Sequence, residues 1–331
     1  MAFHLARLHA LNFRNHREAE VDLGPEVNCF TGPNGVGKTN LLDAVHYLAI
    51  GKGYLEPQDQ HNIHAEEEGF VLQGVMRGED GDDAVLCSVR RGERKVLSRN
   101  RKEYDRLADH VGRYPVVMIT PYDGQLILDG SEARRRLIDG LIAQFDKPFL
   151  DTLIRYNRAL AQRNTLLKQM QSHGAGSSSA FAPWDEQLCA LGTSIHAARS
   201  AFVEELAPLL AGHYQAISSG HEEVSLAHRS ALSGTGMAEL LAGAWERDRA
   251  AGHTTVGVHK DDLLFQLDGQ PLKRFGSQGQ QKTYLIALKL AQFEITARRS
   301  GQKPLLLLDD IFDKIDPQRD VPYEISVQLE D

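Results

Sequence analysis

The chain has 331 residues, 42% of them hydrophobic, a length typical of about two domains. No apolar run approaches the roughly 18 residues of a membrane helix, and the N-terminal stretch lacks a signal-peptide core, so we expect a cytoplasmic protein with no membrane partner. The net charge of −8 argues weakly against nucleic acid, and Cys29, Cys87 and Cys189 have no metal or disulfide spacing.

Short strands are predicted over residues 3–31, and residues 32–39 then read GPNGVGKT, the phosphate-binding pattern G-x-x-x-x-G-K-T. The apolar run 27–31 before this loop predicts a strand, and residues 40–50 after it predict a helix. Glycines permit positive φ and close approach, so backbone N–H groups and the helix N-terminus can face a polyphosphate. Lys38 would reach the β- and γ-phosphates, and Thr39 would bind Mg²⁺. The predicted nucleotide-binding residues here are Gly32, Pro33, Asn34, Gly35, Val36, Gly37, Lys38, Thr39 and Asn40.

Residues 70–97 predict an antiparallel meander over 70–76, 84–89 and 95–97, and residues 115–119 predict a buried strand. A basic strip lies on the last strands and loop of the meander, after an acidic stretch at 56–83. Because local patches decide phosphate binding, this strip is a candidate nucleic-acid contact, with Arg134–Arg136 as a second. A solvated basic edge is the open alternative. The strip consists of Arg90, Arg91, Arg94, Lys95, Arg99, Arg101 and Lys102.

Helical patterns cover residues 131–170, which Pro148 interrupts, and residues 183–211. Apolar residues at heptad spacing give each pattern a seam, and the Gly- and Ser-rich residues 172–180 connect the two. The pattern favours an antiparallel helix pair, with two ordinarily packed helices as the alternative. The seams are Phe149, Leu153, Tyr156 and Leu160, and Trp184, Leu188, Leu191, Ile195, Ala198 and Phe202.

The last part of the chain predicts a hairpin at 265–272 with Asp268-Gly269 as its turn, a helix from about 275 to 299, and a central strand at 305–308. Asp309 and Asp310 end that strand. Mg²⁺ prefers oxygen ligands and usually needs one or two carboxylates, so we expect Asp309 to hold the metal through its hydration shell. We expect Asp310 to be catalytic, orienting or deprotonating the attacking water.

A second anion site is predicted at the start of the 275–299 helix, formed by Ser277, Gln278, Gly279 and Gln280. One nucleotide needs one phosphate loop, so a second site indicates that two chains sandwich the nucleotide. The open alternative is a helix start that Ser277 simply caps.

These motifs, with the order GPNGVGKT, SQGQQKT and LLLLDDIFDKID, resemble the ATPase heads of ABC and SMC proteins. Residues 11–15, 130–139 and 259–262 make the chain similar to the RecF recombination family over almost its whole length. The resemblance implies an α/β fold: an ABC-type P-loop ATPase head with an antiparallel β subdomain and a helical lid domain. It divides the chain into 1–120 plus 251–331 for the ATPase domain and 121–250 for the lid.

The resemblance also implies function. RecF-like proteins bind ATP and DNA, form homodimers on ATP, hydrolyse ATP slowly, and act with RecR-like and RecO-like proteins to place RecA at single-stranded gaps in repair, replication and the SOS response. By position, Lys38 and Thr39 match Walker A, Asp309 and Asp310 match Walker B, and Asp316 matches the D-loop. Gln125 is the candidate for the Q-loop glutamine.

The sequence departs from this family pattern after Arg319, where neither a further strand nor a switch histidine is recognisable. This predicts a truncated or frame-shifted end and leaves two alternatives open. One is a nucleotide-binding module without turnover. The other is the ATPase subunit of an ABC transporter, which shares the three motifs.

Overall fold

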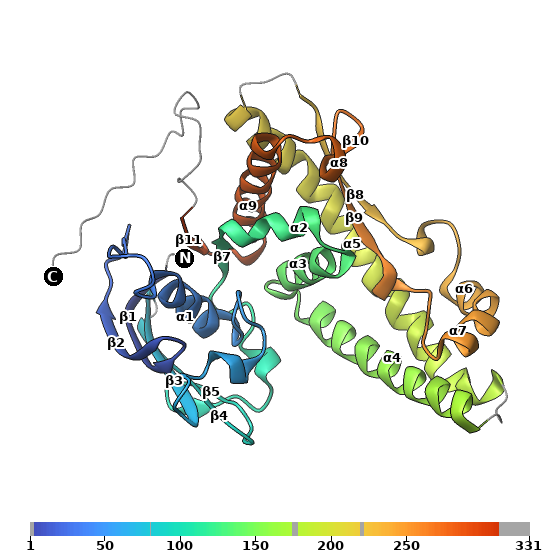
Figure 1. Cartoon of the computed structure of the whole chain (residues 1–331), viewed down its shortest axis with the longest axis horizontal. Coiled ribbons are helices and arrows are strands. Elements are labelled where there is room, and N and C mark those ends of the chain that lie inside the picture. Colours follow the sequence, from blue (N-terminus) through green and yellow to red (C-terminus); the bar gives the residue numbers. More distant parts are fainter. Residues whose placement is uncertain (1–2, 80, 174–177, 219–221, 311–331) are drawn as a thin grey trace. The chain divides into compact units, whose positions relative to one another are not determined.

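The computed structural model describes residues 3–79, 81–173, 178–218 and 222–310 of the chain (Figure 1). The chain forms two compact units. Among the described residues, the first comprises 3–79, 81–122, 217–218 and 289–310, and the second comprises 123–173, 178–216 and 222–288. No described helix is long and apolar enough to cross a membrane.

The strands are β1 (Phe3–Phe13), β2 (His16–Asp22), β3 (Gly69–Gly78), β4 (Gly81–Arg90), β5 (Val96–Arg99), β6 (Lys102–Glu103), β7 (Val116–Ile119), β8 (Val224–Arg229), β9 (Asp262–Leu267), β10 (Gln270–Pro271) and β11 (Leu305–Leu308). The α-helices are α1 (Lys38–Ile50), α2 (Gln125–Leu128), α3 (Ser131–Ala143), α4 (Lys147–His173), α5 (Ala182–Ser218), α6 (Met237–Gly243), α7 (Trp245–Ala251), α8 (Leu272–Phe275) and α9 (Gln278–Ser300). Short 3₁₀ turns include η1 (Asp59–Asn62) and η6 (Val258–Lys260).

The first unit is built on an antiparallel sheet with the strand order β2-β1-β3-β4-β5-β6. In β3 the buried residues follow the two-residue period of a strand with one covered face. In β1 the period is broken, because the pairing with β3 shifts between Leu5 and Arg7. This irregularity adds one residue, so Leu5 and Leu8 face the same core although they are three positions apart. The predicted meander is confirmed.

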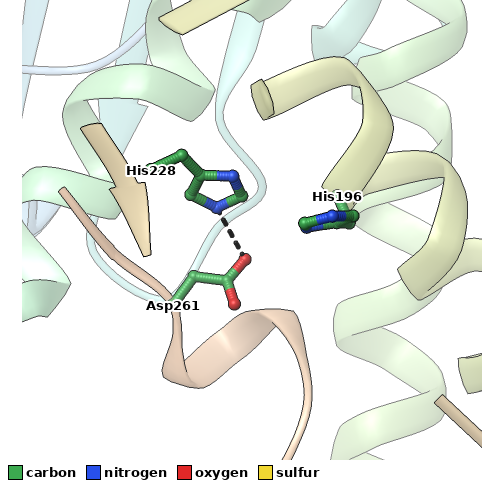
Figure 2. Close-up of side chains that lie close together, drawn as sticks. All are labelled: His196, His228 and Asp261. Carbon is green, nitrogen blue, oxygen red and sulfur yellow. Dashed lines mark hydrogen bonds and ion pairs between the residues drawn. The ribbon is translucent and has the colours of Figure 1, made fainter. Parts of the chain in front are cut away.

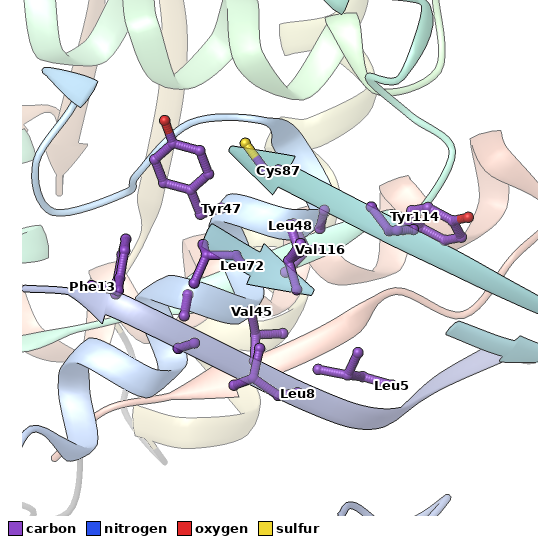
Figure 3. Close-up of a cluster of buried hydrophobic side chains, with 14 of the residues drawn as sticks. Leu5, Leu8, Phe13, Val45, Tyr47, Leu48, Leu72, Cys87, Tyr114 and Val116 are labelled. Carbon is purple, nitrogen blue, oxygen red and sulfur yellow. The ribbon is translucent and has the colours of Figure 1, made fainter. Parts of the chain in front are cut away.

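The core of this unit lies between the sheet and α1 (Figure 3). Helix α1 contributes Val45 and Leu48, which are three positions apart on one face of the helix, and also Tyr47 from a neighbouring face. The Phe13, Tyr47 and Phe70 rings meet edge to face with centroids 5.2–6.1 Å apart. Packing of this face fixes α1, and therefore the loop at its N-terminus, against the sheet.

The predicted strand at 27–31 is wrong. Residues 27–31 form no ladder with any described residue, and Val27 is 48% exposed. The segment is instead held by local contacts: the Asn28 side chain accepts a hydrogen bond from the Gly24 N–H at 2.7 Å and donates to the Gly24 carbonyl at 2.9 Å. A side chain that bonds nearby backbone offers it an alternative to a sheet ladder.

The predicted strands at 115–119 and 305–308 pair in parallel as β7 and β11, from Leu305 opposite Val116 to Leu308 opposite Ile119. The pairing continues one residue further, since the Asp309 N–H donates to the Ile119 carbonyl at 2.9 Å. The ladder therefore delivers Asp309 to the carboxyl end of β11.

The second unit combines α3, α4 and α5 with an antiparallel sheet in the order β10-β9-β8. Residues Asp268 and Gly269 both have positive φ, 48° and 72°, as a two-residue type I′ turn requires, and they confirm the predicted hairpin. The helix seams are buried at Tyr156, Leu188 and Ile195.

The compact units differ from the expected domain division in residues 251–288. These residues belong to the second unit, because β9 pairs with β8 along its full length. The unit boundary then falls inside α9, between Leu288 and Lys289.

Candidate nucleotide-binding site

The phosphate loop has the backbone that its glycines allow. Gly32, Gly35 and Gly37 have φ values of 148°, 87° and 105°, which other residues rarely adopt. Residues 31–36 are exposed, and Gly37 is the N-cap of α1. The loop therefore leads directly into a helix N-terminus, where N–H groups without helical partners attract anions.

The Lys38 side chain turns back over this loop. Its ammonium donates to the carbonyl oxygens of Gly32 at 2.8 Å and of Pro33 at 3.0 Å. These contacts hold the positive charge beside the exposed loop, where a bound polyphosphate would need it.

Thr39 and Asp309 are brought together although 270 positions separate them in the sequence. The Thr39 hydroxyl donates to Asp309 Oδ1 at 2.7 Å. Burial raises the pKa of the Asp309 carboxyl, the Thr39 hydrogen bond lowers it, Asp310 raises it and Lys38 lowers it. A buried carboxylate and a hydroxyl at this distance are oxygen donors of the kind that Mg²⁺ prefers. Asp310 is exposed, with a positive φ of 41°.

The turn between β1 and β2 contributes contacts to the loop that the sequence motif does not predict. Asn15 Nδ2 donates to the Gly35 carbonyl at 3.3 Å, and His16 Nε2 lies 3.1 Å from the Gly37 carbonyl. A Cβ atom on Gly37 would lie 2.3 Å from His16 Nε2, so the close approach requires glycine there. The structure therefore places Asn15 against the phosphate loop.

Helix α1 is held from the same turn. Arg14 donates to Asn62 at 2.9 Å and to Asn40 at 3.3 Å, and it also binds the fully buried Asp43. Burial raises the pKa of the Asp43 carboxyl, and the Arg14 charge opposes that rise. Asn40, predicted to bind the nucleotide, donates to Asn15 at 2.7 Å. The only sequence signal for this network was the short turn Asn12–Asn15.

Residues 277–280 belong to the second unit and begin α9. The Ser277 hydroxyl accepts from the Gln280 N–H at 3.2 Å, and Gln280 Oε1 accepts from the Ser277 N–H at 2.7 Å. This reciprocal pair is a capping box, as the capping alternative expected. Ser277, Gln278 and Gly279 remain exposed. Gln125 is exposed at the start of α2, and Asp316 lies outside the described residues.

The basic strip divides into two groups. The first is occupied within the fold: Lys95 binds Asp59 at 2.8 Å and stands 5.3 Å from the Tyr47 ring centroid, and Arg99 binds Asp83 at 2.7 Å. The second group is exposed: three of its members lie at the end of β4 and in the loop that follows, and two lie at or after the positive-φ turn formed by Asn100 and Arg101 between β5 and β6. It comprises Arg90, Arg91, Arg94, Arg101 and Lys102. In the second candidate, Arg134 is bound to Asp262 at 2.7 Å, whereas Arg136 is exposed.

A cluster of His196, His228 and Asp261 has ligand atoms within 4.8 Å of one another (Figure 2). Its hydrogen bonds disfavour a metal. His228 Nε2 lies 3.0 Å from Asp261 Oδ2, and its Nδ1 lies 2.9 Å from the Ser200 hydroxyl, so both ring nitrogens are engaged. The Arg199 guanidinium donates to the same Asp261 oxygen at 3.0 Å. A metal ion at this cluster would be repelled by the Arg199 guanidinium, which already binds Asp261.

Comparison with known proteins places the chain in a family. The profile of the family described as an AAA domain matches residues 7–170. "DNA replication and repair protein RecF" from Flavobacterium johnsoniae is 45% identical over 316 residues, covering 96% of this chain and 88% of the relative. The protein of the same name from Phocaeicola vulgatus is 47% identical over 317 residues, covering 95% and 85%.

Solved structures agree with these relatives. The structure titled "recombination mediator protein RecF-ATP in RecFOR pathway" has a TM-score of 0.89 at 27% identity, covering 95% of this chain and 86% of that one. An Smc head domain from Pyrococcus furiosus, with a TM-score of 0.50 at 13% identity over 94% and 90% of the two chains, shares the fold. The P-loop ATPase head fold of the RecF and SMC type, mixed α/β, is therefore confirmed, and the chain belongs to the RecF family of DNA replication and repair proteins.

Proposed function

We propose that this chain is an ATP-dependent, DNA-binding recombination mediator of DNA repair and replication. It forms a homodimer on ATP and, with RecR-like and RecO-like partners, helps load RecA at single-stranded gaps. The observation that carries the proposal is the 2.7 Å contact between Thr39 Oγ1 and Asp309 Oδ1, because it joins the phosphate loop to the strand-end carboxylate as a nucleotide site needs. The names of the relatives, with 45–47% identity, support the role in repair.

The cofactors of this proposal are ATP and Mg²⁺. A solved relative is titled as a RecF-ATP structure, and residues 32–40 offer the exposed loop described above. Thr39 and Asp309 would hold Mg²⁺, which neutralises phosphate charge when bound. Asp309 is 5% exposed, and a buried carboxylate gains from a nearby cation.

We propose slow hydrolysis with Asp310 orienting the water, since this exposed side chain directly follows Asp309. The alternative function, a nucleotide-binding module without turnover, differs from this proposal only in lacking ATP hydrolysis. A phosphate-release assay on the full chain with ATP and Mg²⁺ separates the two. The relatives and structures described above are repair proteins and SMC heads, which favours DNA over the membrane partner of a transporter subunit.

Residues 277–280, at the start of α9, provide the test of ATP-dependent assembly. Because Ser277 and Gly279 are exposed at the start of α9, we propose that they meet the nucleotide of a second copy. In wild-type protein, ATP with Mg²⁺ should convert monomer to dimer and raise DNA affinity, as measured by analytical ultracentrifugation and fluorescence anisotropy.

The variant Ser277→Arg should leave ATP binding nearly intact but block this dimerisation, because the arginine places bulk at the helix end. Ser277→Ala is the matched control: it removes the capping hydroxyl, at about 1 kcal/mol of stability, but adds no bulk, and should still dimerise. Equal losses of ATP binding and assembly in Ser277→Arg would contradict the two-chain site.

DNA binding should run through the exposed group of the basic strip. A phosphate contact releases counterions, and the slope of log K against log salt changes by about 0.9 per contact on duplex DNA. Replacing Arg91, Arg101 and Lys102 with glutamine should therefore flatten this slope by about two to three units and weaken binding to all sequences alike.

The same triple variant should dimerise on ATP as the wild type does, because these side chains are exposed and make no described ion pair. If the slope of log K against log salt is unchanged while dimerisation is intact, these three residues do not contact DNA, and the DNA-binding surface lies elsewhere. Lys95 and Arg99 are unsuitable for this experiment, since their replacement would also break their ion pairs with Asp59 and Asp83.

A further inference from the structure

The second unit contains a cavity of about 260 Å³ that the proposed function has not used. Helix α3 lines it with four charged residues at positions i, i+3, i+4 and i+7, which share one helix face. Two of these residues are exposed and two are half-buried, and a charged side chain that is half-buried ordinarily has an ionic partner. The four residues are Glu132, Arg135, Arg136 and Asp139.

Two of the cavity's charges cancel within the fold. Arg199 of α5 binds the Asp139 carboxylate with two nitrogens at 2.8 and 2.9 Å, and its third nitrogen donates to the Val258 carbonyl and to Asp261. The Tyr156 and His259 side chains, which also line the cavity, have their own hydrogen-bond partners. The Tyr156 hydroxyl lies 2.9 Å from His259 Nδ1, and His259 Nε2 lies 3.0 Å from the Thr254 carbonyl, so the ring donates through Nε2 and accepts at Nδ1.

Arg135 differs from Arg199 in having only neutral partners. One of its terminal nitrogens donates to the Ser131 hydroxyl and to the Asp261 carbonyl, both at 2.6 Å. No described carboxylate forms an ion pair with it. Burial lowers the pKa of the Arg135 guanidinium and the Arg199 charge lowers it further, whereas the charges of Glu132, Asp261 and Asp262 raise it. A half-buried guanidinium whose hydrogen-bond partners are all neutral is stabilised when an anion binds beside it.

The rim supplies further donors. Arg136 is exposed, and its Nη1 lies 3.6 Å from Oε1 of Glu132, which is also exposed. An exposed ion pair of this kind contributes little stability in water. The exposed Asn157 of α4 adds an amide. A guanidinium presents a planar fork that matches phosphate oxygens. The volume lies below the roughly 300–1,000 Å³ of pockets for drug-sized ligands, so one anionic group fits better than a whole nucleotide.

We propose that this cavity is a binding site for a single phosphate group, held by Arg135 with Arg136 and Asn157 at its rim. The inference deepens the proposed function, because a DNA backbone is the source of phosphate that a repair mediator meets. Free phosphate has the same chemistry, and the experiment separates the two sources.

The first arm uses inorganic pyrophosphate as the probe and full-length Lys38→Met protein as the background, since this substitution weakens the phosphate loop as a competing site. Calorimetric titration should show saturable binding. Arg135→Gln should weaken that binding about tenfold or more, as for a lost charge-assisted hydrogen bond. Arg136→Gln, which removes no buried contact, should weaken it by a smaller factor. Arg155→Gln is the control, because it removes an exposed α4 charge that does not line the cavity.

The second arm measures DNA affinity against salt with Lys38 intact. If the phosphate comes from DNA, Arg136→Gln should flatten the slope by about 0.9 on duplex or about 0.7 on single strands, and Arg155→Gln should not. A slope unchanged while pyrophosphate binding is weakened assigns the cavity to free phosphate. Absence of saturable pyrophosphate binding, or equal binding in Arg135→Gln, Arg136→Gln and Arg155→Gln, overturns the proposal. The first arm needs neither ATP nor DNA. Its result therefore still tests the cavity if the proposed function fails its own tests.

Discussion

Replacing Lys38 with methionine should abolish tight ATP binding, and this is the largest effect that we expect on function. The ammonium already rests on the Gly32 and Pro33 carbonyls, so it is positioned over the loop before nucleotide arrives. Hydrogen bonds to charged groups contribute about 1.5–3 kcal/mol each. Loss of contacts to two phosphates should weaken affinity by roughly 10²- to 10⁴-fold, as measured by calorimetric titration with ATP.

Two control variants make this result specific. Lys52→Met removes an exposed lysine that follows α1 and should bind ATP as the wild type does. Thr39→Ala removes the hydroxyl that contacts Asp309 and should weaken only the Mg²⁺-dependent part of the affinity, seen by comparing titrations with and without Mg²⁺. Wild-type affinity in Lys38→Met would show that residues 32–39 are not the nucleotide site.

Replacing Arg163 with methionine should destabilise the second unit by about 3–5 kcal/mol, the cost of leaving a buried charge without its partner. Arg163 is 1% exposed and binds Asp248, which is fully buried, at 2.7 Å. It also binds Asp185 at 2.7 Å and Thr254 at 2.8 Å. The substitution therefore leaves the fully buried Asp248 carboxylate without its cationic partner.

Tryptophan fluorescence during urea unfolding measures this effect directly, because both tryptophans of the chain lie beside this network. Trp184 donates to Gln162 at 3.2 Å, and the Trp245 ring packs on Phe181 with centroids 5.0 Å apart. Arg249→Gln, which breaks only the exposed pair with Glu246, should cost at most about 1 kcal/mol. Adding Asp248→Asn to Arg163→Met should recover part of the loss. A loss from Arg163→Met no larger than that from Arg249→Gln would show that the pair is not structurally important.

The sequence by itself determined the features that depend on local chemistry. The spacing of residues 32–39 predicted a phosphate loop because only glycine readily adopts three positive φ values there. The two-residue period of residues 70–97 predicted the meander, and the turn at Asp268-Gly269 predicted the hairpin. Four leucines before Asp309 predicted a strand that ends in carboxylates; its expected central position is wrong, because among the described residues β11 pairs with β7 in a two-stranded sheet and Leu306 is exposed. Each of these signals lies within a few consecutive residues, where backbone sterics and burial period act.

The tertiary structure alone decided which distant residues meet. Thr39 and Asp309 touch only because α1 packs on its sheet and β11 pairs with β7. The same basic strip contains Lys95, committed to Asp59, and Arg101, exposed at a turn, and no sequence pattern separates them. The run 27–31 has strand composition, but it pairs with no described strand, and the Asn28 side chain binds the Gly24 backbone instead. In the second unit, Arg135 and Arg199 reach one cavity from different helices. Charge pairing and burial are properties of three-dimensional neighbours, so their outcome is set when the elements pack.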